Sequence, residues 1–300
     1  MNQQIKILIA GGTGLIGQRL TTLLQLEGFS VSYLSRKEGI KNGIKCFKWD
    51  PTANSIDVNA LEGITHIINL AGESIAGNRW SDSFKEKIIQ SRLNASSTIL
   101  NALKKNPNQV KAIIGSSAIG IYGDRADQLL TENSNAGNGF LSETVVKWEA
   151  SYNEFNVRTV LLRLGIVLSK GGGALVPMST PIKFGIVPIL ATGKQWMSWV
   201  HIDDACGLMI HAIKNENMIG VYNAVAPNPV THRNFMLSLR TILNKFSIPF
   251  PVPSFLLKIM MGEQKAIVTD SVNVTSRKSE EVGYAYKFSK LKNALKNIYE

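Results

Sequence analysis

The chain has 300 residues, which is enough for one large α/β domain, alone or with a smaller lobe. Its hydrophobic content of 44% suits a globular protein with a substantial core, and no stretch approaches the roughly 20 apolar residues that span a bilayer. Lysines scattered along the chain supply most of the net charge of +11, so we expect neither a membrane nor a nucleic acid as partner.

The first residues and the metal-binding residue types exclude two further classes. The polar start, residues 1–4, lacks the charged, apolar and small-residue regions of a signal peptide, which predicts a cytoplasmic protein. Cys46 and Cys206 form no CxxC pair and the four histidines show no metal-ligand spacing, so we expect reduced thiols and no metal. The expected partner is a small-molecule substrate, and the expected state is a monomer or a homodimer.

Short apolar runs alternate with helical patterns through the first half of the chain. Residues 5–10 predict a buried strand that ends in glycines, and the leucine pattern after residue 15 predicts a helix that Gly28 closes. A second strand at 31–34 completes a βαβ unit. The alternation continues through strands at 66–71, 111–116 and 158–164 and helices at 82–105 and 141–155. This order predicts an α/β fold with a Rossmann-type, doubly wound parallel sheet.

Regular alternation weakens after Ser169. Asp203 has the type and position of the N-cap of a helix that runs to Ile213, and another helix is expected over 232–244. Three prolines within 249–253 predict a turn-rich link before the C-terminal segment. The expected domains are a Rossmann domain over 1–169, with returning segments around 195–225, and a smaller C-terminal substrate lobe that takes most of 170–300.

Three glycines follow the first strand at the spacing Gly11-x-x-Gly14-x-x-Gly17, directly before a helix. Gly11 lets the chain leave the strand sharply, Gly14 lets a pyrophosphate approach the backbone, and Gly17 lets the helix pack closely on the sheet. The helix N-terminus then presents free N–H groups and a partial positive charge to phosphate. We predict a dinucleotide site whose turn residues are Gly11, Thr13, Gly14, Leu15 and Ile16.

The end of the second strand distinguishes NAD from NADP. An acidic residue there would hold the ribose 2′-hydroxyl, but this chain reads Ser35-Arg36-Lys37 and has no acid before Glu38. Ser35 can donate a hydrogen bond to a 2′-phosphate, and Arg36 can neutralise it and stack on the adenine. The pattern favours NADPH over NADH; the alternative is that Arg36 and Lys37 simply face solvent.

Beyond the glycine turn, several motifs together resemble the extended short-chain dehydrogenase/reductases. More narrowly, they resemble epimerase-family proteins described as sugar-nucleotide epimerase-like or cell-division-inhibitor-like, whose C-terminal domain the tail around 253–263 also resembles. The resemblance covers essentially the whole chain. The motifs that carry it include Asn69-Leu70-Ala71-Gly72-Glu73, Arg79-Trp80, Ser91-Arg92-Leu93, the run Ser116 to Gly123, Phe140-Leu141-Ser142-Glu143, Gly193-x-x-Trp196 and the run Trp199 to Asp204.

The resemblance implies further cofactor contacts. They would begin near the adenine, pass beside the ribose and pyrophosphate, and end at the nicotinamide. In that order, the implied contacts are Asp50, Leu70, Ala71, Gly72, Glu73, Arg92, Ser116 and Arg163. Alternatively, Leu70 and Ala71 belong to the core of the sheet and Arg92 is a surface arginine.

The proton-handling residues of that superfamily are missing. Its enzymes usually carry Tyr-x-x-x-Lys on the helix after the Ser-Ser strand, where the lysine lowers the tyrosine pKa for proton exchange with the substrate. Here that helix, from Phe140 to Lys147, contains no tyrosine, and Ala118 stands where many members have serine or threonine. The remaining candidates for catalysis are Ser117, Tyr122 and Glu143. Alternatively, Tyr122 packs under its loop and Glu143 is a helix N-terminal charge.

The substrate side is expected after Gly171, where Arg79, Trp80, Trp196 and His201 would line a cleft at the carboxyl end of the sheet. Alternatively, the two tryptophans fill the interface between the lobes. The sequence thus predicts an NADP(H)-binding oxidoreductase, similar to epimerases and dehydratases, that acts on an unidentified small polar or nucleotide-linked substrate. Because the tyrosine–lysine pair is missing, the alternative is a catalytically degenerate NADPH-binding sensor or regulatory protein.

Overall fold

The structure is a computed structural model and describes residues 5–243 and 246–300. Its larger part is built on a nine-stranded sheet. The strands of this sheet are β1 (Lys6–Ala10), β2 (Ser30–Ser35), β3 (Gly39–Lys41), β4 (Ile44–Asp50), β5 (Ser55–Ile56), β6 (His66–Asn69), β7 (Ala112–Ala118), β9 (Arg158–Leu164) and β15 (Gly220–Ala224). They lie in the order β15-β9-β7-β6-β1-β2-β4-β3, with β5 beside β4.

The pairing confirms the predicted doubly wound sheet. Seven strands, from β15 to β4 in that order, run parallel, and β3 and β5 are antiparallel additions beside β4. The chain order reverses between β1 and β6. In open sheets of this kind, ligands bind in the crevice outside the carboxyl ends of the strands at such a reversal.

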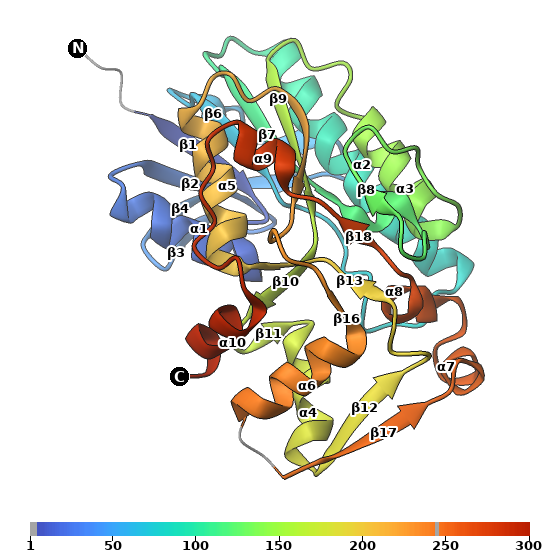
Figure 1. The fold of residues 1–300 in the computed structure, drawn as a ribbon. Helices are drawn as coiled ribbons and strands as arrows, with labels where there is room; N and C mark the ends of the chain where they lie inside the picture. Colours follow the sequence, from blue (N-terminus) through green and yellow to red (C-terminus); the bar gives the residue numbers. More distant parts are fainter. Residues whose placement is uncertain (1–4, 244–245) are drawn as a thin grey trace.

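Helices cover both faces of this sheet (Figure 1). The helices on its two faces are α1 (Leu15–Leu26) and α5 (Ile202–Lys214) on one, and α2 (Asp82–Lys105) and α3 (Phe140–Ala150) on the other. Alternate residues of β1 enter the two cores: Ile7 and Ile9 pack on the α1 side, and Leu8 and Ala10 on the α2 side. Because β1 is buried on both faces, its sequence is a continuous apolar run.

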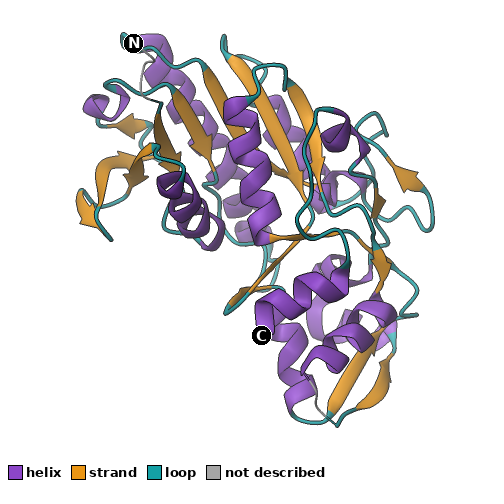
Figure 2. Ribbon diagram, turned by 60° about the vertical axis from the view of Figure 1, so that its left-hand side comes forward, coloured by secondary structure: helices purple, strands orange, loops and turns teal. Residues whose placement is uncertain are grey.

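A smaller lobe lies beneath the carboxyl ends of the large sheet (Figure 2). Its core includes Phe235, Trp199 and Leu295. The elements of the lobe are β10 (Ile166–Ser169), β11 (Gly172–Gly173), α4 (Leu175–Lys183), β12 (Ile186–Leu190), β13 (Trp196–Met197), β14 (Trp199–His201), β16 (Val230–Thr231), α6 (His232–Leu243), β17 (Ile248–Val252), α7 (Ser254–Met261), η3 (Gly262–Lys265), α8 (Ala266–Thr269) and α10 (Leu291–Tyr299). Over the described ranges, no helix combines the length and the apolar character that crossing a membrane requires.

The chain returns from the smaller lobe to the larger part after residue 270. There β18 (Asn273–Val274) pairs with β8 (Leu129–Leu130), and α9 (Arg277–Glu281) lies against β15. Tyr284 then donates a hydrogen bond to Asp204 of α5. The segment from β18 to Tyr284 therefore packs with the large sheet before α10 completes the core of the smaller lobe.

One predicted helix cap is wrong. His201, not Asp203, is the N-cap of α5, because the His201 ring accepts a hydrogen bond from the Asp203 amide at 3.1 Å. Asp203 lies in the first turn instead, and its carboxylate forms an ion pair with Arg19 of α1. An aspartate in the first turn favours the helix in either case, so residue type alone does not separate the two positions.

Two predicted boundaries also differ. The helix expected over 141–155 ends at Ala150, where tighter turns of i→i+3 hydrogen bonds begin. The turn-rich link expected over 249–253 is the strand β17, which pairs with β12 in parallel. The helix expected over 232–244 is α6, and Asn244 lies outside the described residues.

Candidate functional site

The glycine turn joins β1 to α1. Gly11 has φ +80°, the left-handed region that favours glycine, and a Cβ there would lie 2.8 Å from the backbone carbon of Leu70. A Cβ on Gly17 would lie 2.5 Å from the Gly11 carbonyl oxygen, so α1 and the turn touch through backbone. A Cβ on Gly14 would meet only that same oxygen, at 3.3 Å, which leaves the outer side of Gly14 open to a ligand. This geometry fits the cofactor that the spacing predicts.

The N-terminus of α1 suits an anion. α1 begins at Leu15 with Gly14 as its N-cap, and no side chain caps it. Its first turn contains no acidic residue, so nothing in that turn neutralises the partial positive charge of the helix end. Thr13, Leu15 and Ile16 surround this end, and their backbone is placed to hold a pyrophosphate.

β2 pairs with β1 along its length, so Ser35 and Arg36 lie at the same edge of the sheet as the glycine turn. The Arg36 side chain is exposed, and the Ser35 hydroxyl accepts a hydrogen bond from the Lys37 amide at 3.3 Å. Asp50 ends the adjacent β4, and its carboxylate accepts hydrogen bonds from the hydroxyl and amide of Thr52, which lower its pKa. The adenine end thus offers an exposed cation, whereas Asp50 is engaged with its own loop.

Residues 70–73 run past the same turn. The Leu70 amide donates to the last residue of β1 at 2.9 Å, and Leu70 and Ala71 pack partly against the two cores. Arg92 of α2 is not a surface arginine: it donates to the Glu73 carbonyl oxygen at 3.0 Å, and its guanidinium lies 4.9 Å from the centre of the Trp148 ring. Burial lowers the pKa of Arg92 to about 10. Arg92 therefore fixes the segment beside the glycine turn while it remains charged at neutral pH.

Polar side chains at the carboxyl end of β7 form one buried network. Arg163 of β9 donates to Glu149 of α3 through Nε and Nη2, both at 2.8 Å, and through Nη1 to Tyr122 Oη at 2.9 Å. Ser117 donates its hydroxyl proton to the same carboxylate, and the neighbouring Ser116 donates to the β6 backbone. Burial opposes the charge on Arg163, but Glu149 and Tyr122 raise its pKa above the ordinary value. The Arg163 side chain thus links α3 to the sheet.

This network fixes the direction of the hydroxyl protons. Tyr122, the last residue of η2 (Ile119–Tyr122), is fully buried and donates to Asn223 Oδ1 at 2.7 Å, and burial raises its pKa. Because Ser117 and Tyr122 both donate to protein acceptors, neither hydroxyl presents a proton to a ligand in this arrangement. Glu143 is exposed in the first turn of α3, where a negative charge favours the helix. Tyr122 is thus packed, and Glu143 is a helix N-terminal charge.

Two of the predicted substrate residues are held by neighbouring loops. Trp80 is 9% exposed, and its ring packs edge-on against Phe140 with centroids 4.8 Å apart. Trp196 is partly buried, and its Nε1 donates to Asp127 at 2.8 Å. Arg79 is exposed, with Nη2 4.0 Å from the position of a Cβ on Gly262. Trp196 of β13 therefore joins the smaller lobe to the larger part, whereas Trp80 packs within the larger part.

The structure separates His201 from these residues. Its ring lies against Phe288 in the C-terminal tail, with ring centroids 4.0 Å apart, and caps α5. It lines a hollow together with Arg19 and Asn297. Burial lowers the pKa of His201. His201 thus lies beside the C-terminal tail and Arg19, whereas the two tryptophans contact Phe140 and Asp127.

A cavity of about 580 Å³ lies where loops of the larger part meet the segment from α8 onward. The residues that line it are Asp124, Arg125, Gly137, Asn138, Ala266 and Asp270. Burial, together with the nearby charge of Asp124, raises the pKa of Asp270 to about 6. The two carboxyl groups are far apart in the chain, so the sequence offered no signal for this pair.

Glu149 is a further residue that the sequence-based candidates omit. It lies on α3 next to Trp148 and one turn after Val145, both of which are buried. An acidic residue beside the apolar stripe of a helix is partly buried and needs a partner of opposite charge. The place of Glu149 beside this stripe was therefore the sequence signal that could have identified it. Arg163, already singled out, is that partner.

The fold and the glycine turn define an extended short-chain dehydrogenase/reductase with a C-terminal lobe. The sequence pattern of the NAD dependent epimerase/dehydratase family matches residues 7–225, and a domain of unknown function, DUF1731, matches residues 252–298. The chain belongs to the NAD dependent epimerase/dehydratase family. Human "Epimerase family protein SDR39U1" and Bacillus subtilis "Epimerase family protein YfhF" are each 33% identical over 300 residues, covering 98% of this chain and 99% and 98% of their own.

Solved structures extend the likeness to three dimensions. Human SDR39U1 (isoform 2) with NADPH superposes with a TM-score of 0.89 at 32% identity, covering 98% of this chain and 99% of the human chain. A nucleoside-diphosphate sugar epimerase from Corynebacterium glutamicum gives 0.78 at 28% identity and covers 99% of this chain but 58% of its own. UDP-glucose 4-epimerase of Thermus thermophilus, at 17% identity and a TM-score of 0.75, shares the fold.

Proposed function

We propose that this chain binds NADPH at the glycine turn and is an oxidoreductase of the epimerase or dehydratase type, with a small polar or nucleotide-linked substrate. The observation that carries the proposal is the open side of Gly14 at the uncapped N-terminus of α1, with the exposed Arg36 at the adjoining strand end. The human relative, whose structure contains NADPH, supports the same cofactor.

Different residues at the carboxyl end of the sheet bind different parts of the cofactor. Backbone amides after Gly14 hold the pyrophosphate, Arg36 faces the 2′-phosphate, and the segment that Arg92 fixes lies along the ribose. When bound, NADPH supplies a hydride to the substrate. Ser117, whose hydroxyl proton goes to Glu149, retains lone pairs that can accept a hydrogen bond from a substrate hydroxyl.

A second candidate function is an NADPH-binding sensor or regulatory protein. One observation favours it: α3 carries no tyrosine, and the hydroxyl groups of Ser117 and Tyr122 donate inside the protein. A reaction at neutral pH that moves a hydride also needs a proton partner. A protein that only binds the cofactor has no such requirement.

Cofactor titration tests the binding part of the proposal. Fluorescence titration with NADPH and NADH is expected to show tighter binding of NADPH, and Arg36→Ala is expected to weaken NADPH binding by about tenfold while NADH binding changes little. Lys105→Ala, which removes an exposed lysine at the far end of α2, is the matched control. Equal affinity for both cofactors, unaffected by Arg36→Ala, would contradict the choice of NADPH.

A separate measurement distinguishes the enzyme from the sensor. NADPH consumption is followed with a panel of carbonyl compounds. Conversion of nucleotide-linked sugars is followed by chromatography with NADP+ present, because an epimerase or dehydratase returns its hydride and consumes no net cofactor. The oligomeric state is measured with and without NADPH. Turnover of any substrate supports the oxidoreductase. Tight NADPH binding that changes the oligomeric state, together with no turnover across the panel, supports the sensor and overturns the enzymatic proposal.

A further inference from the structure

One face of the two-stranded sheet β12–β17 is uncovered in the described part of the chain. Its inner face presents Val187 and Ile189 to the core that α4 and α6 complete. Its outer face carries Ile186, Ile248 and Phe250, whose side chains are 47%, 63% and 57% exposed. Figure 1 shows this sheet at the end of the smaller lobe that is farthest from the large sheet. An apolar sheet face so placed has nothing to pack against within the described chain.

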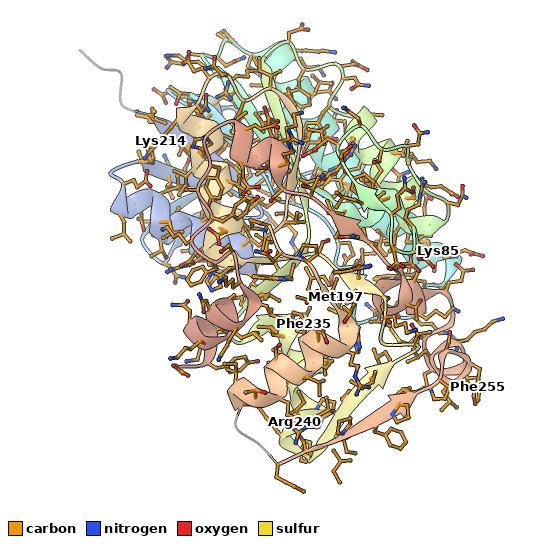
Figure 3. The ribbon with its side chains drawn as sticks, in the orientation of Figure 1. Lys85, Met197, Lys214, Phe235, Arg240 and Phe255 are labelled. Atoms are coloured by element: carbon orange, nitrogen blue, oxygen red, sulfur yellow. The ribbon has the colours of Figure 1, made fainter. Side chains whose placement is uncertain are left out.

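The helix that follows β17 is exposed in the same way. Of the eight residues of α7, only Leu257 is buried, whereas Phe255, Ile259 and Met260 are 63%, 71% and 74% exposed. Phe255 is labelled in Figure 3, on α7 at the margin of the molecule. We call the three outer residues of the sheet and these three residues of α7 the apolar tip. Ordinary surface helices bury their apolar side, so this helix lacks a partner.

Two long stretches of the chain that build most of the smaller lobe are also free of acidic residues. No aspartate or glutamate occurs between Glu154 and Asp203 or between Glu216 and Glu263. Within 170–202 and 217–262 the chain nevertheless carries seven lysines and arginines, of which Lys245 lies outside the described residues. Lys183 and Lys258, next to or within the apolar tip, are exposed. The segments that carry the apolar tip therefore hold positive charges and no acidic residue.

The free edge of β17 is not suited to pairing with a strand of another molecule. The Ile248 amide donates to the carbonyl oxygen of Gly185, the residue before β12, at 2.9 Å. Because successive amides of a strand point to opposite sides, the amide positions of Pro249 and Pro251 face away from β12. Both residues lack an N–H, and the free edge of β17 therefore cannot pair with an added strand in the usual way. A second copy of the chain, packed tip against tip, would also bring together two positively charged segments that contain no acidic residue, which costs electrostatic energy.

We propose that the apolar tip binds the surface of an anionic phospholipid bilayer. Its aromatic and aliphatic side chains enter the region between headgroups and acyl chains, and Lys183 and Lys258 lie among the anionic headgroups. An anionic bilayer offers both an apolar region and negative charge, so it complements the tip better than a partner that offers only negative charge. The function is additional to cofactor binding, because the tip lies on the smaller lobe and the glycine turn on the larger part.

Vesicle flotation with the full chain tests this surface. The protein is expected to float with vesicles of equal parts phosphatidylglycerol and phosphatidylcholine, to stay in solution with pure phosphatidylcholine, and to bind less as salt is raised. Phe255→Ser with Ile259→Ser is expected to lower the partition coefficient about tenfold or more. Lys183→Glu with Lys258→Glu is expected to lower it about tenfold.

Matched variants keep the test specific. Leu26→Ser with Ile40→Ser removes two side chains that are 78% and 80% exposed on the larger part, and Lys105→Glu with Lys292→Glu reverses two exposed charges elsewhere. Both control variants are expected to float like the wild type, and thermal unfolding by circular dichroism checks that every variant folds. No flotation of the wild type, equal flotation with neutral vesicles, or equal losses in control and tip variants would each overturn the proposal. So would a tip variant that loses only self-association, or charge variants that lose only binding to a DNA duplex.

Discussion

Glu149 of α3 and Arg163 of β9 join a helix to the sheet through two parallel hydrogen bonds of 2.8 Å each. The two side chains are 13% and 8% exposed. Because water is largely excluded from both charges, each side chain depends on the other for neutralisation of its charge. The Glu149 carboxylate also accepts the hydroxyl proton of Ser117. The packing of α3 and the polar groups at the end of β7 therefore depend on the same carboxylate.

The first prediction concerns the removal of one partner. Glu149→Gln leaves the Arg163 guanidinium buried without a counter-charge, and is expected to lower the free energy of unfolding by about 3–5 kcal/mol in chemical denaturation. The exposed pair Lys104–Glu154 is the control, and Glu154→Gln there is expected to change the free energy of unfolding little, because solvent screens both charges. A combined Glu149→Gln, Arg163→Met variant should recover part of the loss. Equal effects at both pairs would show that the buried pair has no special role.

The second prediction separates cofactor binding from folding within the glycine turn. Gly14→Ala adds a methyl group that meets one atom at 3.3 Å, so the fold is expected to survive, whereas NADPH affinity is expected to fall about tenfold or more. Gly17→Ala places its methyl group 2.5 Å from the Gly11 carbonyl oxygen and is expected to lower the free energy of unfolding by about 1–3 kcal/mol. Thermal unfolding and cofactor titration measure the two effects. A Gly14→Ala variant with unchanged affinity would place the pyrophosphate elsewhere.

The sequence predicted the cofactor half of the fold well for a physical reason. β1 and β6 are buried on both faces, so each contains a short continuous apolar run. The glycine spacing reports backbone contacts within a few residues. The contact of Gly17 with Gly11 is an example, because both partners lie in one short segment.

Features that depend on distant segments were not predictable in this way. His201 takes the capping position because α5 follows β14 directly, and Asp203 is then free to pair with Arg19, far away in the chain. The prolines of β17 indicated a turn because their role as an edge strand depends on β12. The family resemblance implied Arg163 as a cofactor contact, and Tyr122 was a remaining candidate for proton exchange. Only the distant partners Glu149 and Asn223 show where their hydrogen bonds go.

The third prediction concerns acid stability. His66 and His232 are buried, and burial lowers the pKa of each to about 4. Because the folded pKa lies below the ordinary value of 6.5, the unfolded chain takes up protons first, and stability is lost as the pH falls from about 6.5 towards 4. His201 is also buried, and burial lowers its pKa in the same direction. His232→Gln removes one of these three groups and is expected to flatten part of this loss, whatever its effect at pH 8. Parallel curves for the variant and the wild type, measured by denaturation at each pH, would contradict this assignment.

The fourth prediction has the opposite sign and concerns the cavity lined by Asp124 and Asp270. The folded pKa of Asp270 is about 6, above its ordinary value of 3.8, so the folded state holds this proton more tightly and gains stability as the pH falls from about 6 to 4. At pH 8 the buried charge is a cost, and Asp270→Asn is expected to raise the free energy of unfolding by on the order of 1 kcal/mol after allowance for partial exposure. The gain should vanish near pH 4, where wild-type Asp270 is already neutral. Asp124→Asn serves as the control, because it should give part of the same gain by lowering the pKa of Asp270. An Asp270→Asn variant that is less stable than the wild type at pH 8 would show that the ionised carboxylate has a stabilising partner in the cavity.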